Sequence, residues 1–232
     1  MISLFTGIYT VLSILLPSIL VILLVLIVYQ ALTKRGPGES SAVKKGRQAE
    51  KRVKKIVNRL GPDYISYHDI HLPSFETSTR KTQLDHLVLS KFGIFVIETK
   101  NYGGEIKGDS TKHYWQQKIG NRIHSFFSPV KQNQLHVNAV KNTLNLNQLD
   151  APIFSVIVYS ERASLRHVRV PEYNISVTYI SKLKRMIKSM DREIWNHEEI
   201  KTFSQQIDAS INKAQPQPTL DDLYEEAMRI KS

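Results

Sequence analysis

Three charged residues lie at the ends of two neighbouring β-prone runs. Glu98 and Lys100 close the second run, Gly93–Asn101, and Asp85 lies in the run before it. Side chains on a strand alternate between faces, so Glu98 and Lys100 present a carboxylate and an amine on one face. Two nearby carboxylates repel each other in a partly desolvated place, and a divalent cation relieves that repulsion. Oxygen ligands with space left for water suit Mg²⁺ or Mn²⁺, so the pattern indicates metal-assisted hydrolysis of a phosphodiester.

The Glu-x-Lys motif alone is weak evidence for an active site, because it usually marks a surface ion pair worth less than about 1 kcal/mol. Asp85 on the paired run and the central character of Gly93–Asn101, which is apolar on both faces, favour a site. The register stays open at this point. A turn centred on Phe92 sets Asp85 opposite Thr99 and on the wrong face, whereas a shift of one residue pairs it with Glu98 or with Lys100.

The elements around these residues follow from hydrophobic periodicity. Apolar residues spaced three and four apart predict a helix over Gly46–Leu60, which places Glu50 at the edge of its buried stripe. The other predicted elements are strands at Tyr64–Leu72, Gln83–Ser90, Ile153–Tyr159 and Ile175–Ile180, a short strand at Glu105–Lys107 or Tyr114–Ile119, and helices at Pro129–Leu146, Ser181–Met190, His197–Ala214 and Leu220–Ile230. This order predicts an α/β fold with a mixed sheet covered by helices.

The charge of the chain is concentrated in one short region. The 232 residues carry a formal charge of +11 and contain no cysteine, which excludes a disulfide framework and a Cys-ligated zinc site. Residues 34–60 hold ten basic residues against two acidic ones. The high isoelectric point is thus weak support for nucleic-acid binding by itself.

Residues 8–32 predict a single transmembrane helix. Of these 25 residues 17 are Leu, Ile or Val, and at 1.5 Å per residue they span roughly 37 Å, more than the hydrocarbon core requires. Lys34 and Arg35 follow the run and no basic side chain precedes it, which favours an uncleaved anchor over a signal peptide. The same charge order predicts a single-pass protein of the cell membrane with its N-terminus outside and the remainder in the cytoplasm.

The basic residues between 34 and 55 have two candidate partners. Next to a membrane, Lys and Arg attract anionic lipid by about 1 kcal/mol each. The same side chains can contact the phosphates of nucleic acid. Proximity to residues 8–32 favours the membrane, and both uses are compatible.

An ordered string of motifs resembles a known family. The string comprises Gly46, Ala49 and Glu50; Gln83-Leu84-Asp85-His86; Gly93–Tyr102 with Gly104, Ile106 and Gly108; Trp115; and Ser128-Pro129 with Gln132 and His136. Over residues 43–160 it resembles the nuclease-related domain, NERD, which is placed in the PD-(D/E)xK nuclease superfamily. Several members of that family carry one transmembrane helix before the domain.

The resemblance implies a restriction-endonuclease-like fold and a role for each matched residue. Asp85 and Glu98 match the metal-binding acids, and Lys100 matches the active-site lysine. Glu50 matches the helical acid that supports metal or water, and Gln132 matches a polar residue bordering the site. The implied cofactor is Mg²⁺ or Mn²⁺.

Together these observations predict four regions: an anchor at 1–33, a basic linker at 34–45, a nuclease-like domain at 46–190, and C-terminal helices and tail at 191–232. The expected function is metal-dependent hydrolysis of nucleic acid, DNA in preference to RNA, at the inner membrane face. One alternative is a non-catalytic module of the same fold that binds nucleic acid or protein. Another is an envelope scaffold whose acidic tail docks a partner.

Overall fold

The computed structural model describes residues 41–77, 79–146 and 152–214. Its helices are α2 (Ser41–Val57), α3 (Pro129–Thr143), α4 (Leu183–Lys188) and α5 (His197–Ala214), with a 3₁₀ turn η1 at Ile180–Lys182. Its strands are β1 (Tyr64–Pro73), β2 (Lys81–Ser90), β3 (Gly93–Lys100), β4 (Gly104–Asp109), β5 (Tyr114–Ile119), β6 (Arg122–Phe127), β7 (Ile153–Tyr159), β8 (Ala163–Arg169) and β9 (Ile175–Tyr179). The predicted helix at Leu220–Ile230 lies outside the described residues.

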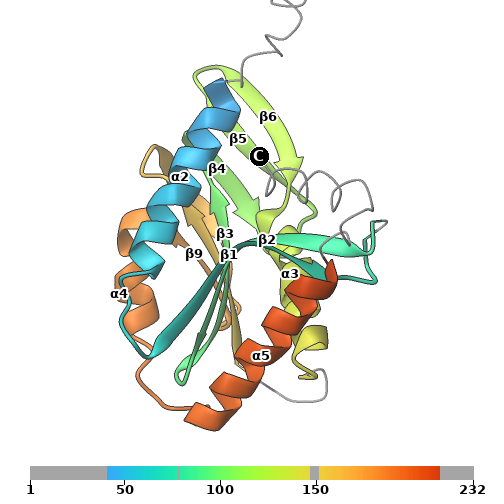
Figure 1. The fold of residues 1–232 in the computed structure, drawn as a ribbon. Helices are drawn as coiled ribbons and strands as arrows, with labels where there is room; N and C mark the ends of the chain where they lie inside the picture. Colours follow the sequence, from blue (N-terminus) through green and yellow to red (C-terminus); the bar gives the residue numbers. More distant parts are fainter. Residues whose placement is uncertain (1–40, 78, 147–151, 215–232) are drawn as a thin grey trace, which may run out of the picture. The chain divides into compact units, whose positions relative to one another are not determined.

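A five-stranded mixed sheet forms the centre of the fold (Figure 1). Its order is β1-β2-β3-β7-β9. β2 is antiparallel to both β1 and β3, whereas β7 is parallel to both β3 and β9. The prediction of a mixed α/β fold is therefore confirmed. β3 is central because all of its residues from Gly93 to Glu98 are buried, as expected for a strand covered on both faces.

Helices cover both faces of this sheet. Ala49, Val53 and Val57 of α2 recur every four residues and pack with α4 against one face of β2, β3 and β7. On the other face α3 and α5 pack against β1, β2 and β3 through a cluster that includes Val137, Val140 and Ile207. Burying side chains of this size contributes roughly 1.5–3 kcal/mol each.

A second sheet was not predicted. Its order is β6-β5-β4-β8, and only β4 and β8 are parallel. Both alternatives for the short strand are realised, as β4 and β5. The sequence analysis missed β6, whose residues are mostly exposed, and β8, most of whose residues are only partly buried or exposed, because neither shows a clear alternation. The fully buried Trp115 ring packs against Gly108, where a Cβ atom would lie 2.1 Å from it.

The β2–β3 hairpin settles the open register. Ser90 pairs with Gly93 and His86 with Ile97, so the turn consists of Lys91 and Phe92 alone. The register predicted from a turn centred on Phe92 is therefore wrong. Continued by one position, the observed register places Asp85 opposite Glu98, on the face that can form a shared site.

No helix within the described ranges is long and apolar enough to cross a membrane, and the predicted span at residues 8–32 lies outside them. Helix α2 begins at Ser41, inside the segment predicted as linker. The boundaries of the four predicted regions remain predictions.

Candidate active site

Glu98 and Lys100 lie side by side at the end of β3, as the alternation predicts. The Lys100 Nζ atom donates to Glu98 Oε1 at 2.7 Å and to Gln132 Oε1 at 2.8 Å. Gln132 comes from the first turns of α3, which Ser128 caps by accepting from the Lys131 N–H. A charge-assisted bond on one side and an amide oxygen on the other hold the amine in place.

Glu98 is almost fully buried, with 5% of its side chain exposed. Burial raises its pKa, but the neighbouring His136 imidazole and the charge of Lys100 outweigh burial and lower the pKa below its usual value. The His136 Nε2 atom lies 3.4 Å from Glu98 Oε2, and its Nδ1 atom is 2.7 Å from the hydroxyl of Thr82. Glu98 therefore stays ionised inside the protein.

Asp85 lies beside this group, where its Oδ2 atom accepts a hydrogen bond from the Thr99 N–H at 2.8 Å. Burial and then the charge of Glu98 raise the pKa of Asp85 to about 7, against the smaller effects of Thr99 and Lys100. The pair is thus under electrostatic strain at neutral pH, because only one of the two acids is readily ionised.

Glu50 approaches from α2 and is exposed to solvent. Partial burial raises its pKa, and the charges of Asp69 and Glu98 raise it further. Among the described residues it forms no hydrogen bond with Lys100, so its connection to the site is through charge and through the shared cleft described next.

One cleft of about 630 Å³ is lined by three of the five predicted site residues. Its lining includes Glu50, Asp85 and Gln132, together with His136. Arg47, Lys51 and Lys54 of α2, spaced four and three residues apart, line it as well. Part of the basic region therefore lines the same cleft as the carboxylates of Glu50 and Asp85.

The donor set fits a divalent cation. Two carboxylates, Asp85 and Glu98, face each other closely enough that one raises the pKa of the other, and a hard cation would favour ionisation of both. Within the described part of the chain no three His, Asp or Glu side chains converge as a ready-made metal cage. An ion held by these two acids would therefore keep positions for water and phosphate, as Mg²⁺ usually does.

Sequence reasoning left His136 and Asn133 without firm roles. His136 holds Glu98, and its spacing of one helical turn from Gln132 is the signal that pointed to it. Asn133 is fully buried and donates to the Val96 carbonyl and to Ser155 Oγ, both at 2.9 Å, which joins α3 to β3 and β7. No sequence pattern distinguishes Asn133 from a solvated asparagine.

The fold and site define an α/β protein with paired acids and a lysine at one end of a central hairpin. Residues 45–160 match the family model of the nuclease-related domain, NERD. The chain is 33% identical over 156 residues to an uncharacterised protein of Bacillus anthracis, covering 66% of this chain and 71% of that relative. The chain belongs to the NERD family.

A solved structure also resembles the chain. It is the small subunit of the heterodimeric restriction endonuclease R.BspD6I, with 14% identity over 72% of this chain and 83% of that one. The TM-score of this comparison is 0.30. Membership of the NERD family supports a nuclease-type function in general.

Proposed function

We propose that this protein is a membrane-anchored, Mg²⁺- or Mn²⁺-dependent nuclease that hydrolyses phosphodiester bonds, with DNA preferred over RNA. The observation that carries the proposal is the convergence of Asp85, Glu98 and Lys100 beside a cleft that Asp85 and basic residues of α2 line. Acids for a cation, an amine for developing negative charge and a basic wall for the phosphate backbone are the parts that this chemistry needs.

Each side chain has a distinct task in this proposal. Asp85 and Glu98 would hold the cation, which supplies Lewis-acid polarisation of the phosphate and a more acidic water. Lys100 donates hydrogen bonds toward the oxygen on which charge develops. Gln132 keeps the amine directed, and Glu50 accepts a proton or orients water at the open side of the cleft.

The basic wall supports nucleic acid as the substrate. Arg47, Lys51 and Lys54 line the same cleft as Asp85 and Glu50. Side chains of this kind neutralise phosphates without reading bases. Contact with the backbone alone predicts cleavage with little sequence preference.

The first prediction is that Asp85→Asn and Glu98→Gln each lower metal-dependent cleavage by about a hundredfold or more. Either change removes a charge from the cation site while it preserves side-chain size. The assay incubates the purified full chain with single- and double-stranded DNA and RNA, with Mg²⁺, with Mn²⁺ and with EDTA. Asp191→Asn, an exposed acid outside the cleft, serves as the matched control.

A second candidate function is the non-catalytic binding module. The observation that favours it is that Glu98 is already paired with Lys100 and His136. If the parent chain binds nucleic acid but cuts no substrate, or if the acid variants cut as fast as the parent, the module replaces the nuclease.

A further inference from the structure

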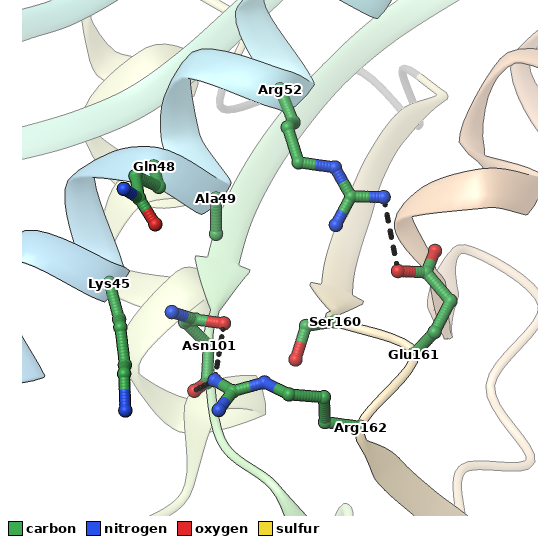
Figure 2. Close-up of a pocket in the computed structure, with 8 residues that line it drawn as sticks. All are labelled: Lys45, Gln48, Ala49, Arg52, Asn101, Ser160, Glu161 and Arg162. Carbon is green, nitrogen blue, oxygen red and sulfur yellow. Dashed lines mark hydrogen bonds and ion pairs between the residues drawn. The ribbon is translucent and has the colours of Figure 1, made fainter.

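A second pocket borders the C-terminal end of β3 on the side of α2 (Figure 2). It has a volume of about 290 Å³. Its lining comes from α2, from the residue after β3 and from the loop after β7: Lys45, Gln48, Ala49, Arg52, Asn101, Ser160, Glu161 and Arg162. The short side chain of Ala49 leaves this space open beneath the helix.

The pocket is positively charged, with three cations against one carboxylate. That carboxylate, Glu161, is fully used: Oε2 accepts from Arg52 at 3.1 Å and Oε1 accepts from the Ser181 N–H at 2.9 Å. Arg162 donates to the neutral carbonyl and side-chain oxygens of Asn101, at 3.0 and 2.9 Å. Among the residues that the structure describes, no carboxylate pairs with Arg162.

Lys45 and Asn101 add hydrogen-bond donors to the pocket. Among the residues drawn in Figure 2 no interaction engages the Lys45 amine. The Asn101 side-chain oxygen accepts from Arg162, which leaves its NH₂ group to donate into the pocket. An amine, an amide NH₂ and a guanidinium around one open volume suit a phosphate group.

The pocket is adjacent to the candidate active site along the chain. Asn101 directly follows Lys100, and the Ser160 N–H donates to the Lys100 carbonyl at 3.2 Å. Consecutive side chains leave an extended chain on opposite sides, so Lys100 turns to Gln132 and Asn101 turns to Arg162. Consecutive Cα atoms are only 3.8 Å apart, so the pocket lies beside the site that would hold the reacting phosphate.

We propose that this pocket is a subsite for a backbone phosphate of the nucleic-acid strand, next to the phosphodiester that lies at Lys100. The inference rests on the proposed nuclease function and extends it by assigning a path for the strand. The strand would cross the C-terminal end of β3, from the cleft lined by Arg47 and Lys51 to the pocket lined by Lys45 and Arg162. Such a contact positions the strand without reading its sequence.

The test measures binding separately from cleavage. The full chain carrying Glu98→Gln is titrated with a fluorescent single-stranded oligonucleotide in EDTA, between 50 and 200 mM salt. We expect Lys45→Gln with Arg162→Gln to weaken binding about tenfold at low salt and to reduce the slope of log K against log salt by about 0.7, the loss of one phosphate contact. Lys201→Gln with Arg192→Gln, which removes the same charge from exposed positions, should change both quantities less.

Arg162 donates to the Asn101 carbonyl, so its replacement can affect folding as well as binding. A variant that changes Lys45 alone separates the two effects. Lys45→Gln alone changes an exposed side chain and should weaken binding about threefold with an unchanged melting temperature. No oligonucleotide binding by the parent, or equal binding by pocket and control variants, would overturn the inference. So would a pocket variant that binds the oligonucleotide normally but loses binding to phosphatidylglycerol vesicles, since the phosphate would then be a lipid headgroup. Failure of the nuclease itself appears separately, as a parent chain that cuts nothing with Mg²⁺ or Mn²⁺.

Discussion

At the scale of single residues, the site depends on opposite electrostatic states of two acids. Glu98 is held ionised by His136 and Lys100, whereas burial and Glu98 raise the pKa of Asp85 to about 7. The side chains that bring about this difference come from β2, β3 and α3. The two acids therefore form a binding site for a cation, because Lys100 and His136 compensate the charge of Glu98 but leave the ionised form of Asp85 unfavourable.

Lys100 is the residue whose loss should separate catalysis from metal binding. Lys100→Met removes the amine that Glu98 and Gln132 orient but keeps both acids. We expect the cleavage rate to fall by about a hundredfold, the usual cost of one donor to developing charge. Single-turnover cleavage at saturating Mn²⁺ measures it, with Lys201→Met as control.

Gln132→Leu is expected to have a smaller effect on the cleavage rate than Lys100→Met. It leaves the amine in place but removes one of its two acceptors, so the rate should fall by about tenfold. If Lys100→Met cuts as fast as the parent, the amine has no part in the reaction.

The sequence predicted this cluster from strand alternation and from the resemblance, and the structure brings Asp85, Glu98, Lys100 and Gln132 together. The face of Asp85 could not be predicted, because it depends on whether the turn holds two or three residues. The role of His136 depends on a contact between β2, β3 and α3 that periodicity does not encode.

At the scale of elements, long apolar segments were predicted best. β7 and α5 have the predicted bounds, Ile153–Tyr159 and His197–Ala214, because their apolar patterns are strong. β6 and β8 are the outer strands of the second sheet; β6 is mostly exposed and β8 is only partly buried, so burial imposes little pattern on their sequences. Part of that sheet depends on pairing between strands far apart in the sequence, such as β4 with β8, and local sequence patterns do not show such pairing.

A histidine pair joins β1 to β2 and should make stability depend on pH. His68 Nδ1 and His86 Nδ1 lie 2.9 Å apart. Burial lowers the pKa of His68 to about 4 and that of His86 to about 3, and the charge of Lys54 adds to both effects. The folded state therefore favours two neutral rings.

The direction of this pH dependence follows from which state, folded or unfolded, binds more protons. Histidines of the unfolded chain titrate near 6.5, so below that pH the unfolded state binds more protons and stability falls as pH falls toward about 4. The loss is about 1.4 kcal/mol per pH unit for each proton. Urea unfolding at pH 7, 6 and 5 should show a smaller loss for His68→Gln than for the parent.

His197→Gln, an exposed histidine on α5, is the control and should behave as the parent does. Asp85 acts in the opposite direction, since its raised pKa favours the folded state as pH falls, so the comparison between variants isolates the histidine pair. Equal pH dependence in His68→Gln and the parent would contradict the prediction.

At the scale of the whole molecule, the basic region serves more than one surface. Arg47, Lys51 and Lys54 line the cleft with the acids, whereas Lys45 and Arg52 line the pocket at the end of β3. The sequence analysis favoured the membrane as the partner of this region because residues 8–32 precede it. The spacing of these residues on α2 divides them between two sides of one helix.

The membrane anchor is tested by fractionation. We expect the full chain to sediment with membranes and to resist extraction by high salt, because the sequence of residues 8–32 is apolar and long enough to span a bilayer as a helix. A chain that begins at residue 34 should be released. External protease should leave residues 34–232 intact in whole cells if they are cytoplasmic, and digestion of this part would contradict the orientation.

The two-residue connection between β2 and β3 limits which insertions and deletions the protein can accept during evolution. Gly93 has φ +148°, and a Cβ there would lie 2.7 Å from the Phe154 ring, so the connection has little freedom. One inserted residue would turn Asp85 away from Glu98 and also move Leu87 and Leu89 out of the core. Evolution can therefore exchange side chains at Lys91 and Phe92, but insertions and deletions should be eliminated there, whereas the exposed Gly120 turn can vary in length.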